Sequence, residues 1–122
     1  MNDTKKKVKI LIVDDDQSFQ DLTGLLLSGR GYEIDKCLDA RTAIEKFLAD
    51  GYTHIVVDLN MPGMSGEQLL ESLRDHKTVA KLAVVTGYSP FAVPTLSVMR
   101  KGFKVIFHKP VQPEVILSWI ET

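Results

Sequence analysis

The sequence HIVVDLNMPGMSG, residues 54–66, decides the prediction of the fold. Its apolar, β-branched run, Ile55, Val56 and Val57, ends in one carboxylate, Asp58, and a loop rich in Pro and Gly follows. A short apolar run bounded by turn residues is typical of a strand buried on both faces of a parallel sheet. Because a charge is costly inside such a strand, we expect Asp58 at its C-terminal end, where open α/β sheets bind ligands. On this stretch alone, a helix N-cap or a loop acid is an equal alternative.

Length and composition fit one ordinary globular domain. The chain has 122 residues, of which 44% are hydrophobic and 25% charged, so it can build a full core. The net charge of -1 and the pI near 6.3 give no indication of a nucleic-acid surface. The single cysteine, Cys37, excludes an internal disulfide, and we expect it to be a buried, inert thiol.

The N-terminal residues differ in character from the rest of the chain. We expect residues 1–7, which include three consecutive lysines, to be a flexible basic tail and residues 8–122 to be one domain. The tail lacks the hydrophobic stretch of a secretion signal, and no apolar run approaches the ~20 residues of a membrane span. The sequence therefore predicts a cytoplasmic protein without a membrane partner.

Strand-like and helix-like segments alternate five times along the chain. Asp16, Asp39 and Ser65 are predicted helix N-caps, because apolar residues at helical spacing follow each of them. Two prolines disturb the start of the fourth helix, whose regular part we expect from Pro94 to Gly102. The alternation predicts parallel βαβ units, hence a doubly wound, five-stranded α/β fold. The expected strands cover residues 8–13, 33–38, 55–58, 81–86 and 104–108.

Polar residues gather at the predicted strand ends. The first strand ends in Asp14 and Asp15, the third in Asp58, the fourth in Thr86 and the fifth at Lys109. In a parallel sheet these ends share one rim, so the side chains should face a common pocket. Clustered carboxylates repel one another unless a cation neutralises them, and Mg²⁺ bound through oxygens suits this set. Mg²⁺, an ammonium and a hydroxyl could neutralise a phosphoryl group, while a carboxylate could act as nucleophile and form an acyl phosphate.

Four segments together resemble the receiver domain of the two-component response regulators. They are ILIVDDD at 10–16, VVDLNMPGMSG at 56–66, VVTG at 84–87 and HKP at 108–110. The resemblance covers the chain from about residue 8 to its end. It implies a flavodoxin-like (βα)5 fold with strand order 2-1-3-4-5, and a signalling protein rather than a conventional enzyme.

The resemblance also implies partners. A sensor histidine kinase or a histidine phosphotransfer protein would supply the phosphoryl group. A downstream protein target would then bind the face formed by the fourth helix, the fifth strand and the fifth helix. The cognate kinase, the signal and the output cannot be named from these residues.

The resemblance assigns roles to individual residues. Asp58 would be the phosphoacceptor, and Asp14 and Asp15 the acidic pair, with Asp15 the more direct Mg²⁺ ligand. Asn60 would lend its backbone carbonyl to the metal. Asp16 would cap a helix rather than bind the ion.

Further residues would contact the phosphoryl group. Thr86 would hydrogen-bond it and Lys109 would pair with its charge, while Gly87 leaves the approach open. The bond between Lys109 and Pro110 would be cis, a geometry that is accessible before proline.

Two features depart from the family pattern. Ile106 occupies the position where the family usually has an aromatic residue that moves together with the threonine. The interval from Thr86 to Lys109 is also one residue longer than is usual, and it contains Pro94. Because a β-branched side chain is stiff, we expect Ile106 to stay packed and the segment 87–94 to change instead.

Other functions remain open from the residues alone. The chain could be a degenerate receiver that only binds partners, a flavodoxin-like cofactor binder, or a phosphatase similar to the haloacid dehalogenases. Such a phosphatase would require a second acid at position 60, which is Asn60. A cofactor phosphate would require backbone amides where this chain has carboxylates. The three histidines, His54, His76 and His108, are expected at the surface or the rim.

Overall fold

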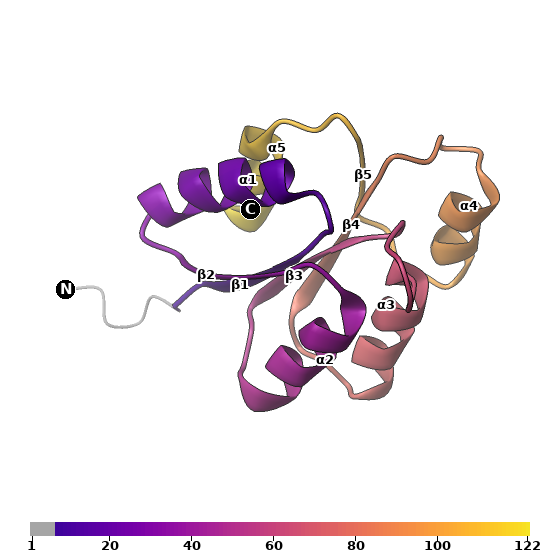
Figure 1. Ribbon diagram of the computed structural model, residues 1–122, viewed down its shortest axis with the longest axis horizontal. Coiled ribbons are helices and arrows are strands. Elements are labelled where there is room, and N and C mark those ends of the chain that lie inside the picture. The colour runs from indigo at the N-terminus through magenta and orange to yellow at the C-terminus, as the bar shows by residue number, and fades with distance from the viewer. Residues whose placement is uncertain (1–6) are drawn as a thin grey trace.

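The computed structural model describes residues 7–122 and shows a five-stranded sheet between two layers of helices (Figure 1). Nearly all of the predicted basic tail, residues 1–6, lies outside the described residues. The strands are β1 Lys9–Val13, β2 Glu33–Cys37, β3 His54–Asp58, β4 Lys81–Thr86 and β5 Ile106–His108. The helices are α1 Gln17–Gly29, α2 Ala40–Ala49, α3 Gly66–Asp75, α4 Val93–Arg100 and α5 Pro113–Ile120.

All strand pairs are parallel, and their order is β2-β1-β3-β4-β5. This confirms the doubly wound α/β fold and the strand order. β3 lies at the centre, and each of its five residues is buried. The reversal of strand order between β1 and β3 places their C-terminal ends side by side, which is where such sheets bind ligands.

Side chains that alternate along the strands divide the core into two clusters. Helices α1 and α5 cover one face of the sheet, and α2, α3 and α4 cover the other (Figure 1). Leu11 and Val13 of β1 face the second set of helices, whereas Ile10 and Ile12 face the first. The near-continuous apolar strands therefore follow from burial on both faces.

Helix caps agree with the predictions. Asp16 and Asp39 accept hydrogen bonds from backbone amides at the starts of α1 and α2. Ser65 and Gln68 form a reciprocal capping box at the start of α3. Helix α4 has no side-chain cap, and it begins one residue before Pro94, close to the predicted start.

Some boundaries differ from the prediction. Strand β5 begins at Ile106 rather than at residue 104, although the carbonyl of Val105 still accepts from the amide of Val84 at 2.8 Å. Helix α4 ends at Arg100, two residues before Gly102, whose φ of 95° turns the chain. None of the helices within residues 7–122 has both the length and the apolar character that crossing a bilayer requires.

Candidate functional site

Three carboxylates meet at the C-terminal rim of the sheet. Asp14 and Asp15 follow β1 and Asp58 ends β3, and one oxygen of each lies within 4.8 Å of the others. The two strands are neighbours, with Val13 opposite Val57, and this register brings the acids together. Asp14 is 1% exposed and Asp58 4% exposed, whereas Asp15 is open to solvent.

The backbone holds Asp58 in a tight turn. The amide of Asn60 donates to Oδ1 of Asp58 at 3.1 Å, which fixes one carboxylate oxygen. Burial, together with the negative charge of Asp14, raises the pKa of Asp58 from its ordinary value near 3.8 to about 7. Without a bound metal ion, this carboxyl is therefore partly protonated at neutral pH.

Lys109 is the cation of the rim. Its Nζ lies 2.9 Å from Oδ2 of Asp14 and 3.6 Å from Oδ2 of Asp58, and its peptide bond to Pro110 is cis, as predicted. Burial lowers the pKa of this amine, but the hydrogen bond to Asp14 and the charges of both acids raise it further, so the net shift is upward. Lys109 thus stays charged and spans two strands of the rim.

Thr86 ends β4 beside Lys109 but is fully buried. Its hydroxyl accepts from the amide of Tyr88 at 3.0 Å, and its carbonyl accepts from the amide of Lys109 at 2.7 Å. Gly87 follows it at the surface. The hydroxyl of Thr86 therefore lies beneath the exposed residues of the rim, and its hydrogen bond holds the loop that begins at Gly87.

A cavity of about 590 Å³ opens above these groups. Asp15, Asp58, Asn60, Gly87 and Lys109 line it, together with the helix-capping Asp16 and the loop residues at 61 and 62. Two further predicted site residues, at positions 14 and 86, support the lining ones from below. The structure thus brings the predicted residues to one place.

The donor set fits a hard divalent cation. Carboxylate and carbonyl oxygens are the ligands of Mg²⁺ and Ca²⁺, and both ions keep several waters in open sites. Three acids with oxygens within 4.8 Å of one another are opposed by a single lysine, so negative charge remains in excess. Asp15 and Asn60, which line the cavity, could complete such a site with Asp58.

Two residues that support the site, Gly66 and Phe19, escaped the sequence analysis. A Cβ on Gly66 would lie 2.0 Å from the carbonyl oxygen of Asp58, so only glycine lets α3 pack against this strand end. The ring of Phe19 lies 5.1 Å from Nζ of Lys109, a cation–π contact. For the packing of Gly66 against Asp58, the only signal in the sequence was a glycine at the start of a helix.

Two expectations concern residues away from the rim. Cys37 is buried as predicted, and burial, with the charge of Asp39, raises the pKa of its thiol to about 12. The expectation that His54 is at the surface or rim was wrong, since it is 6% exposed and its ring meets Trp119 edge to face at 5.2 Å. Its position on β3 opposite Ile10 points it toward α5.

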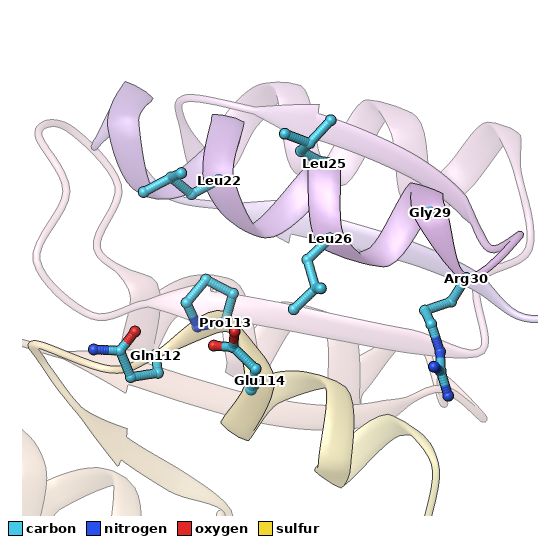
Figure 2. A pocket seen from close by; sticks show the side chains of 8 residues that line it. All are labelled: Leu22, Leu25, Leu26, Gly29, Arg30, Gln112, Pro113 and Glu114. Atoms are coloured by element: carbon cyan, nitrogen blue, oxygen red, sulfur yellow. The ribbon is translucent and has the colours of Figure 1, made fainter.

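A second cavity of about 580 Å³ lies between α1 and α5 (Figure 2). Leu22 and Leu25 of α1 line this cavity, and their exposed fractions are 62% and 75%. Gln112, which ends the loop that follows Lys109, and Pro113, the first residue of α5, form the opposite side. This groove between α1 and α5 is an apolar surface that joins the rim through that loop.

Comparison with known proteins identifies relatives. The Escherichia coli transcriptional regulatory protein HprR is 40% identical over 70 residues, which are 57% of this chain and 31% of that protein. The chain spans about 30% of the length of the first curated relatives that it matches.

Two solved structures share the fold. One is a response regulator from Burkholderia pseudomallei with a phosphorylated aspartic acid, a calcium ion and citrate, which is 27% identical, has a TM-score of 0.84 and aligns over 95% of this chain and 68% of its own. The other is TrrA from Thermotoga maritima in complex with Mg²⁺ and BeF, at 26% identity and a TM-score of 0.78 over 93% and 96%.

A family model extends the match to nearly the whole chain. The model of the response regulator receiver domain matches residues 10–121. This range includes the three clustered acids and all five strands except Lys9, the first residue of β1. The chain therefore belongs to the response regulator receiver domains of two-component signalling, which are not conventional enzymes.

Proposed function

We propose that the protein accepts a phosphoryl group on Asp58 from a sensor histidine kinase or a histidine phosphotransfer protein, in a Mg²⁺-dependent reaction. The observation that carries this proposal is the place of Asp58, a buried carboxylate at the tip of the central strand. One of its oxygens is fixed by a backbone amide, and the other lies 3.6 Å from the Nζ of Lys109. We place this reaction in the cytoplasm, where ATP supplies sensor kinases.

The chemistry is a displacement at phosphorus. A free oxygen of Asp58 attacks the phosphorus of a phosphohistidine, the new O–P bond forms as the N–P bond breaks, and the imidazole leaves with the bonding electron pair. A protonated carboxyl is a poor nucleophile, so the raised pKa of Asp58 must be offset. Lys109 supplies one positive charge for this purpose, and bound Mg²⁺ would supply the rest while neutralising the phosphoryl oxygens.

We propose Asp14, Asp15, Asp58 and Asn60 as the metal site. Asp15 would bind the ion most directly, because it is exposed and lines the cavity. Asp14 would act through its charge and through the ion pair with Lys109. Thr86 would turn its hydroxyl from the amide of the next loop toward the phosphoryl group.

The metal proposal is tested by removing one ligand. Asp15→Asn should lose Mg²⁺ binding by calorimetry and also lose labelling by acetyl phosphate. Asp75→Asn is the matched control, because it removes one exposed carboxylate at the far end of α3. Unchanged Mg²⁺ affinity in Asp15→Asn would refute the assignment.

We propose that the groove between α1 and α5 receives the phosphodonor protein. Its exposed leucines and its link to the loop after Lys109 support this role (Figure 2). Leu25→Asp should block transfer from a phosphotransfer protein but leave labelling by acetyl phosphate intact. Leu48→Asp, at a leucine of α2 that is 61% exposed, is the control. Equal transfer to both variants would contradict this docking.

We propose that output runs through the face formed by α4, β5 and α5. Ile106 packs against the cluster under α2, α3 and α4, and Phe107 packs on the opposite face, so neither ring nor polar tip is available to swing at position 106. The change would instead pass through segment 87–94, which Thr86 holds by its hydrogen bond to Tyr88. Amide exchange with and without beryllofluoride tests this: changes should gather in segment 87–94, and a quiet segment would refute it.

A further inference from the structure

We infer that the groove between α4 and β5 binds a short segment of a partner protein that is both apolar and acidic. This inference rests on the proposed function, because it names the partner chemistry of the proposed output face. The groove encloses about 390 Å³, and its lining includes Phe91, Leu96, Met99, Lys104 and Ile106.

The apolar part of the groove is unusually open. Phe91 is 85% exposed and Met99 54% exposed, and Val93 beside them is 79% exposed. Exposed large apolar side chains that cluster next to a concave surface mark an interaction site more often than scattered ones do. Phe91 and Met99 can close over an apolar side chain inserted between α4 and β5, and methionine adapts readily to varied partners.

The charge around the groove is of one sign. Residues 76–113 contain no Asp or Glu but include six lysines and arginines, although the whole chain has a net charge of -1. A carboxylate partner for these cations must therefore come from elsewhere in the fold or from another molecule.

Among the residues that the structure describes, four of these six cations have no ion-pair partner, and Arg100 and Lys104 are the two at α4 and β5. Lys101 pairs with Glu67 and Glu71 of α3, so it is already neutralised on the side of α4 away from the groove. By contrast, Arg100 and Lys104 are exposed and lie within ion-pair distance of no carboxylate among residues 7–122. An apolar groove flanked by unpaired cations is complementary to apolar side chains interspersed with acids.

The same charges disfavour a second copy of this chain as the occupant. A two-fold axis through the groove would place Arg100 and Lys104 of each copy against residues 76–113 of the other copy. All charged side chains in that range, apart from the histidines, are lysines and arginines. Like charges in such a contact repel, and no acid of α4 or β5 is available to relieve them. An acidic segment of a different protein meets no such penalty.

Hydrogen bonds connect the groove to the rim. The ring of His108, which lines the groove, lies with Nδ1 3.1 Å from the carbonyl oxygen of Tyr88, whose amide donates to the hydroxyl of Thr86. Thr95, also in the groove, donates to the carbonyl of Ser89 at 2.9 Å. If Thr86 turns to a phosphoryl group, the loop loses its anchor and two groove residues lose their fixed partner. Affinity for the segment should therefore differ between the two states.

The test is selection of peptides from a random 16-residue phage library on the full chain with Mg²⁺ and beryllofluoride. Enriched peptides should combine apolar residues with a net negative charge, and amide shifts should map one such peptide to the groove. Lys104→Glu should weaken its affinity about tenfold at low salt. Lys81→Glu, an exposed lysine at the opposite end of β4, should leave it unchanged.

Several results would overturn the inference. They are enrichment of neutral or basic peptides, equal affinities of the two variants, or mapping to another surface. Tight binding of a single-stranded DNA oligonucleotide that Lys104→Glu abolishes would identify a nucleic-acid site, and a dimer that the same substitution strengthens would identify a second copy. Labelling of the chain by acetyl phosphate is measured in parallel. Loss of labelling would count against the proposed function. The peptide selection, repeated without beryllofluoride, would then still test whether the groove binds an apolar and acidic segment.

Discussion

Replacing Asp58 by asparagine should stabilise the metal-free protein at alkaline pH. The folded chain holds this carboxyl in a buried site beside a second acid, and this raises its pKa to about 7. A raised pKa means that the folded state binds the proton more tightly than the unfolded state does. Stability from this group is therefore fully present below about pH 4, falls as the pH rises, and is lost above about pH 7.

The magnitude follows from the same shift. Moving the pKa from 3.8 to about 7 corresponds to about 4 kcal/mol at alkaline pH, at 1.36 kcal/mol per unit. Asparagine keeps the volume and can accept the same amide hydrogen bond, but it loses the ion pair with Lys109 at 3.6 Å. The pKa shift already contains the attraction of Lys109, so about 2 kcal/mol is subtracted instead for the amide NH₂ that asparagine would leave facing that ammonium without an acceptor, and a net gain of about 2 kcal/mol remains.

Urea denaturation at pH 8 and at pH 4.5, both with EDTA, measures this difference. The advantage of Asp58→Asn should be about 2 kcal/mol at pH 8 and should shrink or reverse at pH 4.5. Adding Mg²⁺ at pH 8 should stabilise the wild type more than the variant, because the ion neutralises the cluster. A variant that is less stable than the wild type at pH 8 without metal would refute the electrostatic account of this site.

Other predictions concern the support of the site and the core. Gly66→Ala should destabilise the fold by about 3 kcal/mol in urea denaturation, since its Cβ would overlap the backbone of the preceding strand. Lys101→Met should speed amide exchange in α4, because the ion pair between Lys101 and Glu67 connects that helix to α3. Unchanged exchange would show that this ion pair does not stabilise α4. Burial lowers the pKa of His54, so the unfolded state binds a proton at a higher pH than the folded state does. The free energy of unfolding, measured through the fluorescence of Trp119, should therefore decrease below about pH 6.5. His54→Phe should remove this pH dependence.

The rim of the sheet could be predicted from sequence because it follows from local signals and one rule of topology. Apolar runs that end in Asp14, Asp58 and Lys109 identify strand ends, and parallel strands bring those ends to one edge. The caps at Asp16 and Ser65 were likewise local, since each depends on residues three positions apart. Tertiary packing could not reverse these signals.

The contacts that were missed depend on which elements pack together. The burial of His54 depends on α5, which is some 60 residues further along the chain, and no periodicity around a strand start indicates that neighbour. The need for Gly66 comes from the distance between α3 and a carbonyl oxygen. The open groove beside Phe91 likewise required the structure, because exposure of an apolar residue cannot be read from its own segment.

The central claim, that Asp58 takes the phosphoryl group, is tested most directly by intact-mass measurement after incubation with acetyl phosphate and Mg²⁺. The wild type should gain one phosphoryl group, and EDTA should prevent the gain. Asp58→Asn should gain none, whereas Asp16→Asn, which removes an acid that also lines the cavity but caps a helix, should be labelled like the wild type. Stoichiometric, Mg²⁺-dependent labelling of Asp58→Asn would contradict the account.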